Sequence, residues 1–257
     1  DQNTEVENKD NSQFIDMSLA KDIEAYFQEN GIDHEKVAYC ITDLEHNIKY
    51  SMNEKDEFIA ASIYKLPLAM LYYDKVNEGE YTLDSTFTYS GYMHEDAGVI
   101  SSDYGIGSQV PLSDLLNDLI IYSDNDAGHI LYENLGGWKE YKEAMTKYTD
   151  SISENYYTMD NVTTANTMND VVTYLYDHKE DYKGLIKNME EAEPGEYLDR
   201  DTQLSMPQKY GMYDSALNSV GFVECNTSYS IVVLTSLGDK GADVMANINR
   251  IAYEHFK

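Results

Sequence analysis

Segments typical of β-strands lie near the two ends of the sequence, and a long stretch that is mostly helical in pattern separates them. Near the start, residues 37–42 and 48–52 are rich in β-branched and aromatic side chains and flank a polar turn, which predicts a hairpin. Near the end, residues 204–210, 219–225 and 229–235 have the same character. A sheet built from both ends has to accommodate a helical insertion. We therefore expect two interlocked lobes, with a cleft where the chain crosses between them.

The stretch between the strands has the periodicity of helices. Apolar residues recur at spacings of three and four and so define one buried helix face, made of Leu112, Leu115, Leu116, Leu119 and Ile120. Two further amphipathic runs, 19–30 and 242–256, lie next to the strand-like segments, and Gly31 closes the first of them. Helices therefore accompany the sheet as well as the insertion.

These patterns divide most of the chain into two lobes. We expect residues 14–257 to form a single unit, with an α/β lobe over about 14–60 and 201–257 and a helical lobe over about 61–200. Residues 1–13 are polar and poor in large apolar side chains, which predicts a flexible leader left after processing. An ordinary frayed terminus would give the same pattern.

The charge of the chain excludes several classes of function. Asp and Glu number 47 against 18 Lys and Arg, which gives a formal net charge of −29. Such a surface repels the phosphates of nucleic acids and of anionic membranes, so we expect neither as a partner. The longest apolar runs, such as 231–234, are too short to span a bilayer, and no stable membrane insertion is expected. The abundance of carboxylates also favours a soluble monomer.

Cysteines and histidines do not form a recognisable framework. Cys40 and Cys225 permit one disulfide, but both lie in segments that resemble buried strands, where cysteine usually packs as a small hydrophobic residue. The sequence leaves the bridged and unbridged states open. The six histidines have no ligand spacing, so we expect neither a metal nor an organic cofactor.

The first candidate for chemistry is the S-I-Y-K motif from Ser62 to Lys65. A hydroxyl and an amine three residues apart share one face of a helix. If the helix begins near Ala60, Ser62 lies in its first turn, where free N–H groups favour developing negative charge. A desolvated lysine beside it can take the serine proton. The motif is weak by itself, because chance gives about one S-x-x-K in such a composition, and a second copy begins at Ser18.

Two more motifs follow along the chain. Ser123, Asp124 and Asn125 form an S-D-N sequence between two helical runs, for which chance predicts about 0.14 occurrences. Its simplest interpretation is a helix N-cap, and its catalytic interpretation has Ser123 pass a proton while Asn125 holds a substrate amide. Lys209 and Gly211 flank Tyr210 at the end of a predicted strand, where a positive charge and close backbone approach suit an anionic substrate.

Taken in order, the three motifs resemble those of serine β-lactamases and penicillin-binding proteins, and of class A β-lactamases in particular. The flanking residues 58–67 and 119–128 are similar to the family, and the resemblance extends over about 14–257. It implies an α+β fold of the β-lactamase/transpeptidase type. In that fold a five-stranded antiparallel sheet covered by helices lies beside an all-helical lobe, with the site between them.

The resemblance also implies roles for individual residues. Ser62 would be the nucleophile and Lys65 its activating base. Ser123 and Lys209 would transfer a proton and hold the substrate carboxylate, and Asn125 would bind the side-chain amide of the substrate.

The segment after Lys209 would complete the substrate site. The resemblance implies that Tyr210, Gly211 and Met212 contact the substrate, and that the N–H groups of Ser62 and Met212 form the oxyanion hole. Tyr210 stands where the family usually has threonine, and Met212 where a hydroxyl is common, so we expect ordinary penicillins to lose contacts to their carboxylate.

A second anchor for the substrate carboxylate is also weakly supported. The sequence has only two arginines, Arg200 and Arg250.

The sequence departs from the family in the loop that supplies the base for hydrolysis of the acyl-enzyme. Class A β-lactamases use a glutamate in an E-x-x-L-N stretch, which this sequence lacks. Residues 150–160 run quickly into 163–166, so the loop is shortened. Glu154 is the nearest substitute base, with Asp150 and Asp160 behind it, and all three also fit solvated loop carboxylates. We therefore expect intact acylation and slow deacylation.

Three functions remain open at this point. The leading hypothesis is an envelope or secreted serine hydrolase that opens a β-lactam or a related amide through an acyl-Ser62 intermediate. The first alternative is a penicillin-binding or D-alanyl peptidase-like acyl-transferase that acts on cell-wall peptides, which the missing base suits. The second is a non-catalytic binding module on the same fold, against which the complete set of reactive side chains argues.

Overall fold

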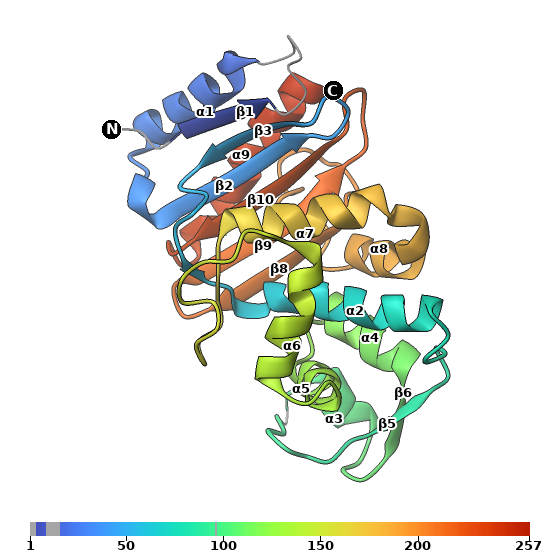
Figure 1. Cartoon of the computed structure of the whole chain (residues 1–257). Helices are drawn as coiled ribbons and strands as arrows, with labels where there is room; N and C mark the ends of the chain where they lie inside the picture. The colour runs from blue at the N-terminus through green and yellow to red at the C-terminus, as the bar shows by residue number, and fades with distance from the viewer. Residues whose placement is uncertain (1–3, 9–15, 96) are drawn as a thin grey trace.

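The computed structural model describes residues 4–8, 16–95 and 97–257, and a six-stranded antiparallel sheet is the centre of its α/β lobe. The strand order is β1–β3–β2–β10–β9–β8, so strands from the two ends of the chain meet where β2 pairs with β10 (Figure 1). The strands are β1 (Thr4–Asn8), β2 (Val37–Asp43), β3 (Ile48–Met52), β8 (Gln208–Tyr213), β9 (Ala216–Val223) and β10 (Tyr229–Thr235). The predicted sheet of strands from both ends is confirmed.

Helices cover this sheet and build the second lobe (Figure 1). They are α1 (Met17–Asn30), α2 (Lys65–Asn77), α3 (Val99–Asp103), α4 (Leu112–Ile121), α5 (Asn125–Asn134), α6 (Trp138–Met145), α7 (Ala165–Asp177), α8 (Lys183–Glu190) and α9 (Lys240–Phe256). Short 3-10 helices are η1 (His34–Lys36), η2 (Ala61–Tyr64), η3 (Thr146–Tyr148) and η4 (Lys179–Tyr182). Two small antiparallel pairs join β4 (Phe58–Ile59) to β7 (Val162–Thr163) and β5 (Thr86–Thr88) to β6 (Gln109–Pro111).

The sheet has one strand more than the five that we predicted. The additional strand, β1, lies within the stretch 1–13 that we expected to be a flexible leader, and the rest of that stretch lies outside the described residues. It pairs with the edge of β3, with Thr4 opposite Met52 and Asn8 opposite Ile48. An edge strand offers N–H and C=O groups that any extended segment can pair with. This pairing depends on the backbone, so the polar side chains of the segment did not indicate it.

Two strand ends and one cysteine also differ from the prediction. β8 begins at Gln208 and not at 204, and β9 ends at Val223, so Cys225 lies beyond the strand and is partly exposed. Cys40 is buried in β2 as expected. The two thiols are not bridged, since Cys40 lies opposite Val232 in the middle of β10 and Cys225 follows the end of β9.

The two faces of the sheet belong to separate hydrophobic cores. Side chains alternate along β10, as they do in any strand. Tyr229, Ile231 and Val233 pack with α1 and α9, whereas Val232 and Leu234 belong to the core that contains α2 and α7. In Figure 1, α7 crosses one face of the sheet and α9 lies behind the other. The second core connects the sheet to the helical lobe.

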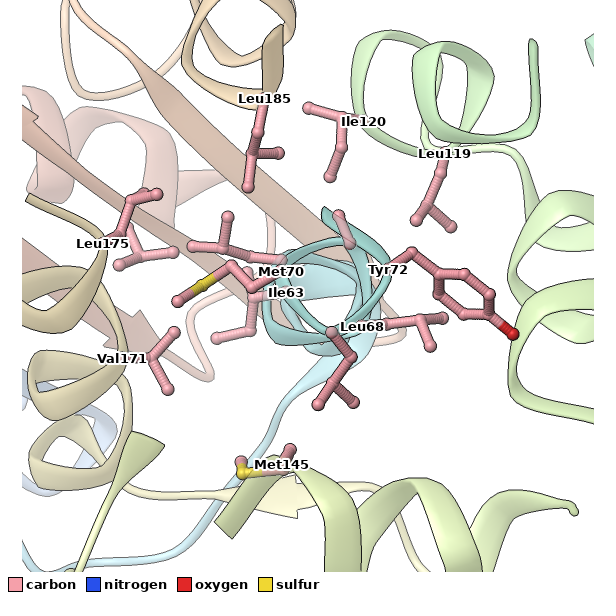
Figure 2. Close-up of a cluster of buried hydrophobic side chains, with 14 of the residues drawn as sticks. Ile63, Leu68, Met70, Tyr72, Leu119, Ile120, Met145, Val171, Leu175 and Leu185 are labelled. Atoms are coloured by element: carbon pink, nitrogen blue, oxygen red, sulfur yellow. The ribbon is translucent and has the colours of Figure 1, made fainter. Parts of the chain in front are cut away.

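The helical lobe is organised around α2, which is buried over most of its length. In Figure 2, side chains of α2 such as Leu68, Met70 and Tyr72 are surrounded by residues of neighbouring helices, namely Leu119, Ile120, Met145, Val171, Leu175 and Leu185. A helix that is apolar on all sides is stable only in a protein interior. Because α2 begins at Lys65, this packing also fixes the position of Lys65.

Truncation of Leu68 to alanine tests the central position of α2. We expect Leu68→Ala to lower the free energy of unfolding by about 2–5 kcal/mol, because it removes buried methyl groups and leaves a cavity. Urea denaturation followed by circular dichroism measures this change, with Leu83→Ala as the control, since Leu83 is 43% exposed. A loss no larger than that of the control would contradict the packing described for α2.

Candidate active site

The segment that carries Ser62 lies where the sheet meets the helical lobe. β4 ends at Ile59, Ala60 follows, and the 3-10 helix η2 leads directly into α2 at Lys65. Ala61 has a φ of +52°, in the left-handed region that residues with a Cβ atom rarely adopt. Such a conformation persists only where the surroundings hold it. Ser62 is therefore presented directly after a fixed bend, in the first helical turn, as predicted.

Two asparagines fasten this bend. Asn218 of β9 donates from Nδ2 to the carbonyl oxygens of Ile59 at 2.9 Å and Ala60 at 3.0 Å. Asn161 donates from Nδ2 to the carbonyl oxygen of Ala61 at 2.8 Å. Neither residue was predicted from the sequence to support the site. Asparagine is disfavoured in strands, so its presence in the apolar segment that became β9 was an available signal. Asn161 had no comparable signal.

The amine of Lys65 is the centre of the site. The side chain is fully buried, and Nζ lies 3.1 Å from Ser62 Oγ. Nζ also lies 2.7 Å from the carbonyl oxygen of Ser123, 3.2 Å from Ser123 Oγ and 2.6 Å from Asn125 Oδ1. The S-x-x-K and S-D-N motifs are therefore brought together as predicted. All four partners are uncharged, and two of them are hydroxyls that can donate as well as accept.

Burial lowers the pKa of Lys65 to about 7, because the ammonium form loses its hydration in this position. The carboxylates of Asp124 and Glu95 oppose this effect from a distance. Glu95 is joined to the site through Asn125, whose Nδ2 donates to the Glu95 carboxylate at 2.7 Å. At neutral pH a large share of Lys65 is therefore the free amine, which is the form that can accept a proton.

The S-D-N turn is held by its central aspartate. The Asp124 carboxylate accepts from the Ala127 N–H at 2.9 Å, which caps α5, and from the N–H groups of Val99 at 2.7 Å and Ile100 at 3.1 Å. Ser123 has a φ of +53°, a left-handed conformation that this anchoring sustains. The N-cap interpretation is confirmed for Asp124, and the same turn directs its two neighbours toward the lysine amine.

Lys209 reaches the same hydroxyl from the sheet. It is fully buried in β8, and its Nζ donates to Ser123 Oγ at 3.0 Å and to the carbonyl oxygen of Tyr210 at 2.6 Å. Burial, and then the nearby Lys65, lower the pKa of Lys209 well below its usual range, while Glu193 acts in the opposite direction. Ser123 Oγ therefore bridges two buried amines, which is the arrangement a proton relay needs.

Gly211 lets β8 approach the nucleophile. A Cβ atom at this position would lie 2.6 Å from the backbone nitrogen of Ser62 and 2.8 Å from that of Ile63, closer than real Cβ atoms come. The strand after Lys209 thus packs directly on the N–H groups at the start of the helical segment. Met212 is 55% exposed beside this contact. The oxyanion hole formed by the N–H groups of Ser62 and Met212 stays a prediction.

The side of the site next to Lys209 is aromatic and not basic. Tyr210 stacks on Tyr197 with ring centroids 4.6 Å apart and an interplanar angle of 16°. Arg200 is paired with Asp201 and with Asp243 of α9. Arg250, which lies on α9, donates to Asn247 of the same helix. Both arginines are thus engaged on the α9 side of the sheet, and neither bonds the residues of the site.

The carboxylates that we considered as substitute bases are exposed, and their role in deacylation stays a prediction. Glu154 makes no hydrogen bond to Ser62 or Lys65, and Asp150 and Asp160 are likewise exposed. The neighbours of Glu154 are held from outside the site instead. Both Ser153 and Asn155 donate to the Glu57 carboxylate, and these bonds lower the pKa of Glu57.

A buried lysine that we did not predict anchors the rest of this loop. Lys142 of α6 is 3% exposed, and its Nζ donates to the carbonyl oxygens of Tyr156 at 2.5 Å, Thr158 at 2.9 Å and Asp160 at 2.6 Å. Asn161, which holds the bend before Ser62, follows immediately. Lys142 therefore fixes the loop whose end supports the nucleophile segment. Contacts to main-chain oxygens leave no side-chain motif, so the sequence did not indicate them.

Neither a metal site nor a membrane span is found in the described part of the chain. No three His, Cys, Asp or Glu side chains within it gather so as to hold a metal ion. None of its helices has both the length and the apolar character needed to cross a bilayer.

The chain matches one family model and is similar in fold to solved structures. A family model described as the beta-lactamase enzyme family matches residues 18–256. The structure is similar to TLA-3 extended-spectrum beta-lactamase, at 21% identity and a TM-score of 0.79, over 93% of this chain and 98% of that one. It is similar to a beta-lactamase from Chitinophaga pinensis, at 22% identity and a TM-score of 0.77, over 93% and 100% of the two chains. A search of curated proteins found no match.

A penicillin-binding protein has the same fold. The structure is similar to a mutant of PBP-A in an acyl-enzyme complex with penicillin G, at 16% identity and a TM-score of 0.77. The match covers 93% of this chain and 96% of that one. At such identities the solved structures establish the fold alone, which confirms the predicted α+β class.

Gly211→Ala tests the contact between β8 and the nucleophile segment. We expect it to lower the free energy of unfolding by about 1–3 kcal/mol, because the added methyl group has to displace backbone atoms. Gly105→Ala is the control, since a Cβ atom there would meet only Ser108 Oγ, at 3.8 Å. Thermal and urea unfolding of both variants measure the difference. Equal stability of the two would show that β8 does not pack on Ser62 as closely as described.

Proposed function

Because the chain belongs to the beta-lactamase enzyme family and is a serine β-lactamase-like hydrolase, we propose that it opens a β-lactam or a related amide through an ester formed on Ser62. One observation carries the proposal. A buried amine with uncharged hydrogen-bond partners, Lys65 Nζ, lies 3.1 Å from Ser62 Oγ. This distance lies within the reach that a general base needs.

In the acylation step that we propose, neutral Lys65 donates its two N–H bonds to the two shortest contacts, the carbonyl oxygen of Ser123 and Asn125 Oδ1. Its lone pair then faces the Ser62 hydroxyl. As Oγ attacks the carbonyl carbon, the proton moves to Nζ and a tetrahedral oxyanion forms. The N–H groups of Ser62 and Met212 would stabilise that oxyanion.

Collapse of the oxyanion breaks the carbon–nitrogen bond, and the leaving nitrogen needs a proton. Ser123 would supply its hydroxyl proton and take a replacement from the Lys65 ammonium, so that in net one proton passes from Ser62 to the leaving nitrogen. Lys209 would position Ser123 and attract the substrate carboxylate. Asn125 would hold the side-chain amide of the substrate, in exchange for its bond to Glu95, and Tyr210 and Gly211 would contact the substrate along β8.

Deacylation is the slow step in this proposal. The ester on Ser62 is hydrolysed only if a base activates water beside it, and Glu154, the nearest candidate in the loop, is exposed. We retain Glu154 as the candidate base for the residual hydrolysis. No metal or organic cofactor takes part.

The same slow step supports one alternative. An acyl-enzyme that persists suits a penicillin-binding or D-alanyl peptidase-like acyl-transferase, which passes the acyl group of a cell-wall peptide to an acceptor. Both functions use small molecules or peptides found outside the cytoplasm, so we propose an extracellular or cell-envelope location and a role in antibiotic resistance if β-lactams are hydrolysed. We also propose that the protein acts as a monomer.

Intact-protein mass spectrometry after mixing with penicillin G tests the acyl-Ser62 intermediate. We expect an adduct of the mass of the antibiotic that decays slowly on the native protein and is absent from Ser62→Ala. Ser18→Ala, which removes the serine of the second S-x-x-K copy, should behave as the native protein does. Rapid product release without an adduct would contradict slow deacylation, and the absence of both adduct and product would contradict the proposed reaction.

The pH dependence of acylation tests Lys65 as the base. Because the pKa of Lys65 is lowered to about 7, the neutral fraction grows as the pH rises. We expect the acylation rate to increase about tenfold between roughly pH 6 and pH 8 and to level off above that. Stopped-flow measurement of adduct formation gives the profile, and Lys65→Ala should lose the rise together with most of the rate. A flat profile in the native protein would rule out Lys65 as the proton acceptor.

A further inference from the structure

A cavity of about 520 Å³ lies beside the nucleophile segment, on the side of the helical lobe. We call it the aromatic pocket, after the side chains that line most of it, which are Tyr64, Tyr92, Met93, Tyr132, Trp138 and Met159. Its volume is in the range of small-molecule sites in proteins. None of the residues to which the proposed reaction gives a role lines this pocket.

Three rings form the inner wall of the aromatic pocket. The ring centroids of Trp138 and Tyr64 are 5.0 Å apart with an interplanar angle of 82°, and those of Trp138 and Tyr132 are 5.3 Å apart at 70°. Edge-to-face contacts of this kind are the preferred arrangement of aromatic groups. A further ring can join such a cluster without disturbing it.

Part of the rim of the pocket is apolar and open to solvent. Tyr92 is 64% exposed, Met93 is 51% exposed and Met159 is 82% exposed. Burial of such large apolar side chains by a ligand is favourable, because it removes their surface from water. Methionine adapts its shape to an aromatic neighbour and makes favourable sulfur contacts with it.

The inner wall and one side of the rim are joined to the active site by very short pieces of chain. Tyr64 follows Ser62 by two residues. Met93 precedes Glu95 by two residues, and the Glu95 carboxylate accepts from Asn125 Nδ2. Two residues of extended chain span at most about 7 Å. The pocket therefore adjoins the side of the site where Asn125 would hold the substrate amide.

The other side of the rim is joined to the bend before the nucleophile. Met159 precedes Asn161 by two residues, and Asn161 donates to the carbonyl oxygen of Ala61. Lys142 holds the main chain on both sides of Met159, through the carbonyl oxygens of Thr158 and Asp160. The exposed side chain of Met159 thus projects from an anchored loop.

The charges around the pocket favour some ligands over others. Two glutamates, Glu133 and Glu140, line it together with one lysine, Lys139, and one histidine, His129, so negative charges outnumber positive ones while the histidine is neutral. The whole chain adds a net charge of −29. An anionic group would be repelled there, whereas an uncharged ring can pack on the aromatic and thioether side chains.

We propose that the aromatic pocket binds the side chain of the substrate's acyl group, and that the group it selects is an uncharged aromatic ring. This inference rests on the proposed function, because it takes the substrate to be an amide attacked by Ser62. It adds a specificity site, formed by α5, α6 and the two loops that carry Met93 and Met159.

Trp138 makes the pocket directly observable, since it is the only tryptophan in the sequence. The experiment uses full-length Ser62→Ala, which binds without acylation, and follows tryptophan fluorescence on titration with penicillin G or with 6-aminopenicillanic acid. Penicillin G carries a phenylacetyl side chain, and the second compound has the same nucleus with a bare amine. We expect a saturable change with penicillin G that 6-aminopenicillanic acid does not reproduce.

Variants at the rim locate the binding. Met159→Ser or Tyr92→Ser, each combined with Ser62→Ala, should lower the affinity for penicillin G by about fivefold or more. Met17→Ser is the matched control, since Met17 is 49% exposed at the start of α1, and it should leave the affinity unchanged. Carbenicillin, which adds a carboxylate to the phenylacetyl group, should bind at least about fivefold more weakly than penicillin G.

The outcomes separate this inference from the proposed function. Equal fluorescence responses to penicillin G and 6-aminopenicillanic acid would overturn the aromatic pocket as the binding site. Unchanged affinity for penicillin G in both rim variants would do the same. Equal affinity for carbenicillin and penicillin G would overturn the selection against charge. If the fluorescence responses are as expected but native protein never forms an adduct, the acylation proposal fails and the pocket stands as a binding site.

Discussion

The burial of one amine among uncharged partners is the interaction on which the site depends. Lys65 has no solvent exposure, and its Nζ meets only hydroxyl, carbonyl and amide oxygens from Ser62, Ser123 and Asn125. A buried ammonium without a carboxylate partner is poorly stabilised, so burial by itself lowers the pKa of Lys65 and favours the neutral amine. The burial in turn exists because α2, which begins at Lys65, is surrounded by apolar side chains. Packing of the helical lobe therefore also sets the environment of the Lys65 amine beside Ser62.

The side chains of the candidate site come from both lobes and meet only in the folded chain. The helical lobe contributes the two serines and Lys65, and the sheet contributes Lys209 together with the glycine that lets β8 lie against the nucleophile. Asn218 ties the sheet to the bend before Ser62. A loss of packing in either lobe would move one half of the site relative to the other. For this reason the stability of the core and the geometry of the site are not independent properties.

Much of this arrangement could be predicted because it is recorded in local patterns. Strand composition at both ends indicated the shared sheet, and the three short motifs indicated which side chains would meet. What was missed depends on backbone pairing or on contacts between distant residues. β1 joins an edge through main-chain groups, Asn161 and Lys142 bind carbonyl oxygens, and Cys225 falls two residues past a strand end that alternation alone did not locate. Side-chain identity carries little information about such contacts.

The anchoring of the loop by Lys142 has a consequence for how this protein can change. Its three acceptors, at Tyr156, Thr158 and Asp160, are main-chain oxygens, which every residue type supplies. Side chains along that stretch can therefore be exchanged while the loop keeps its path and Asn161 keeps its hold on the bend. The contacts that fix the path of the loop are thus separate from the side chains that the loop carries. Mutation can therefore alter the chemistry of this loop one side chain at a time, without a change in the fold around it.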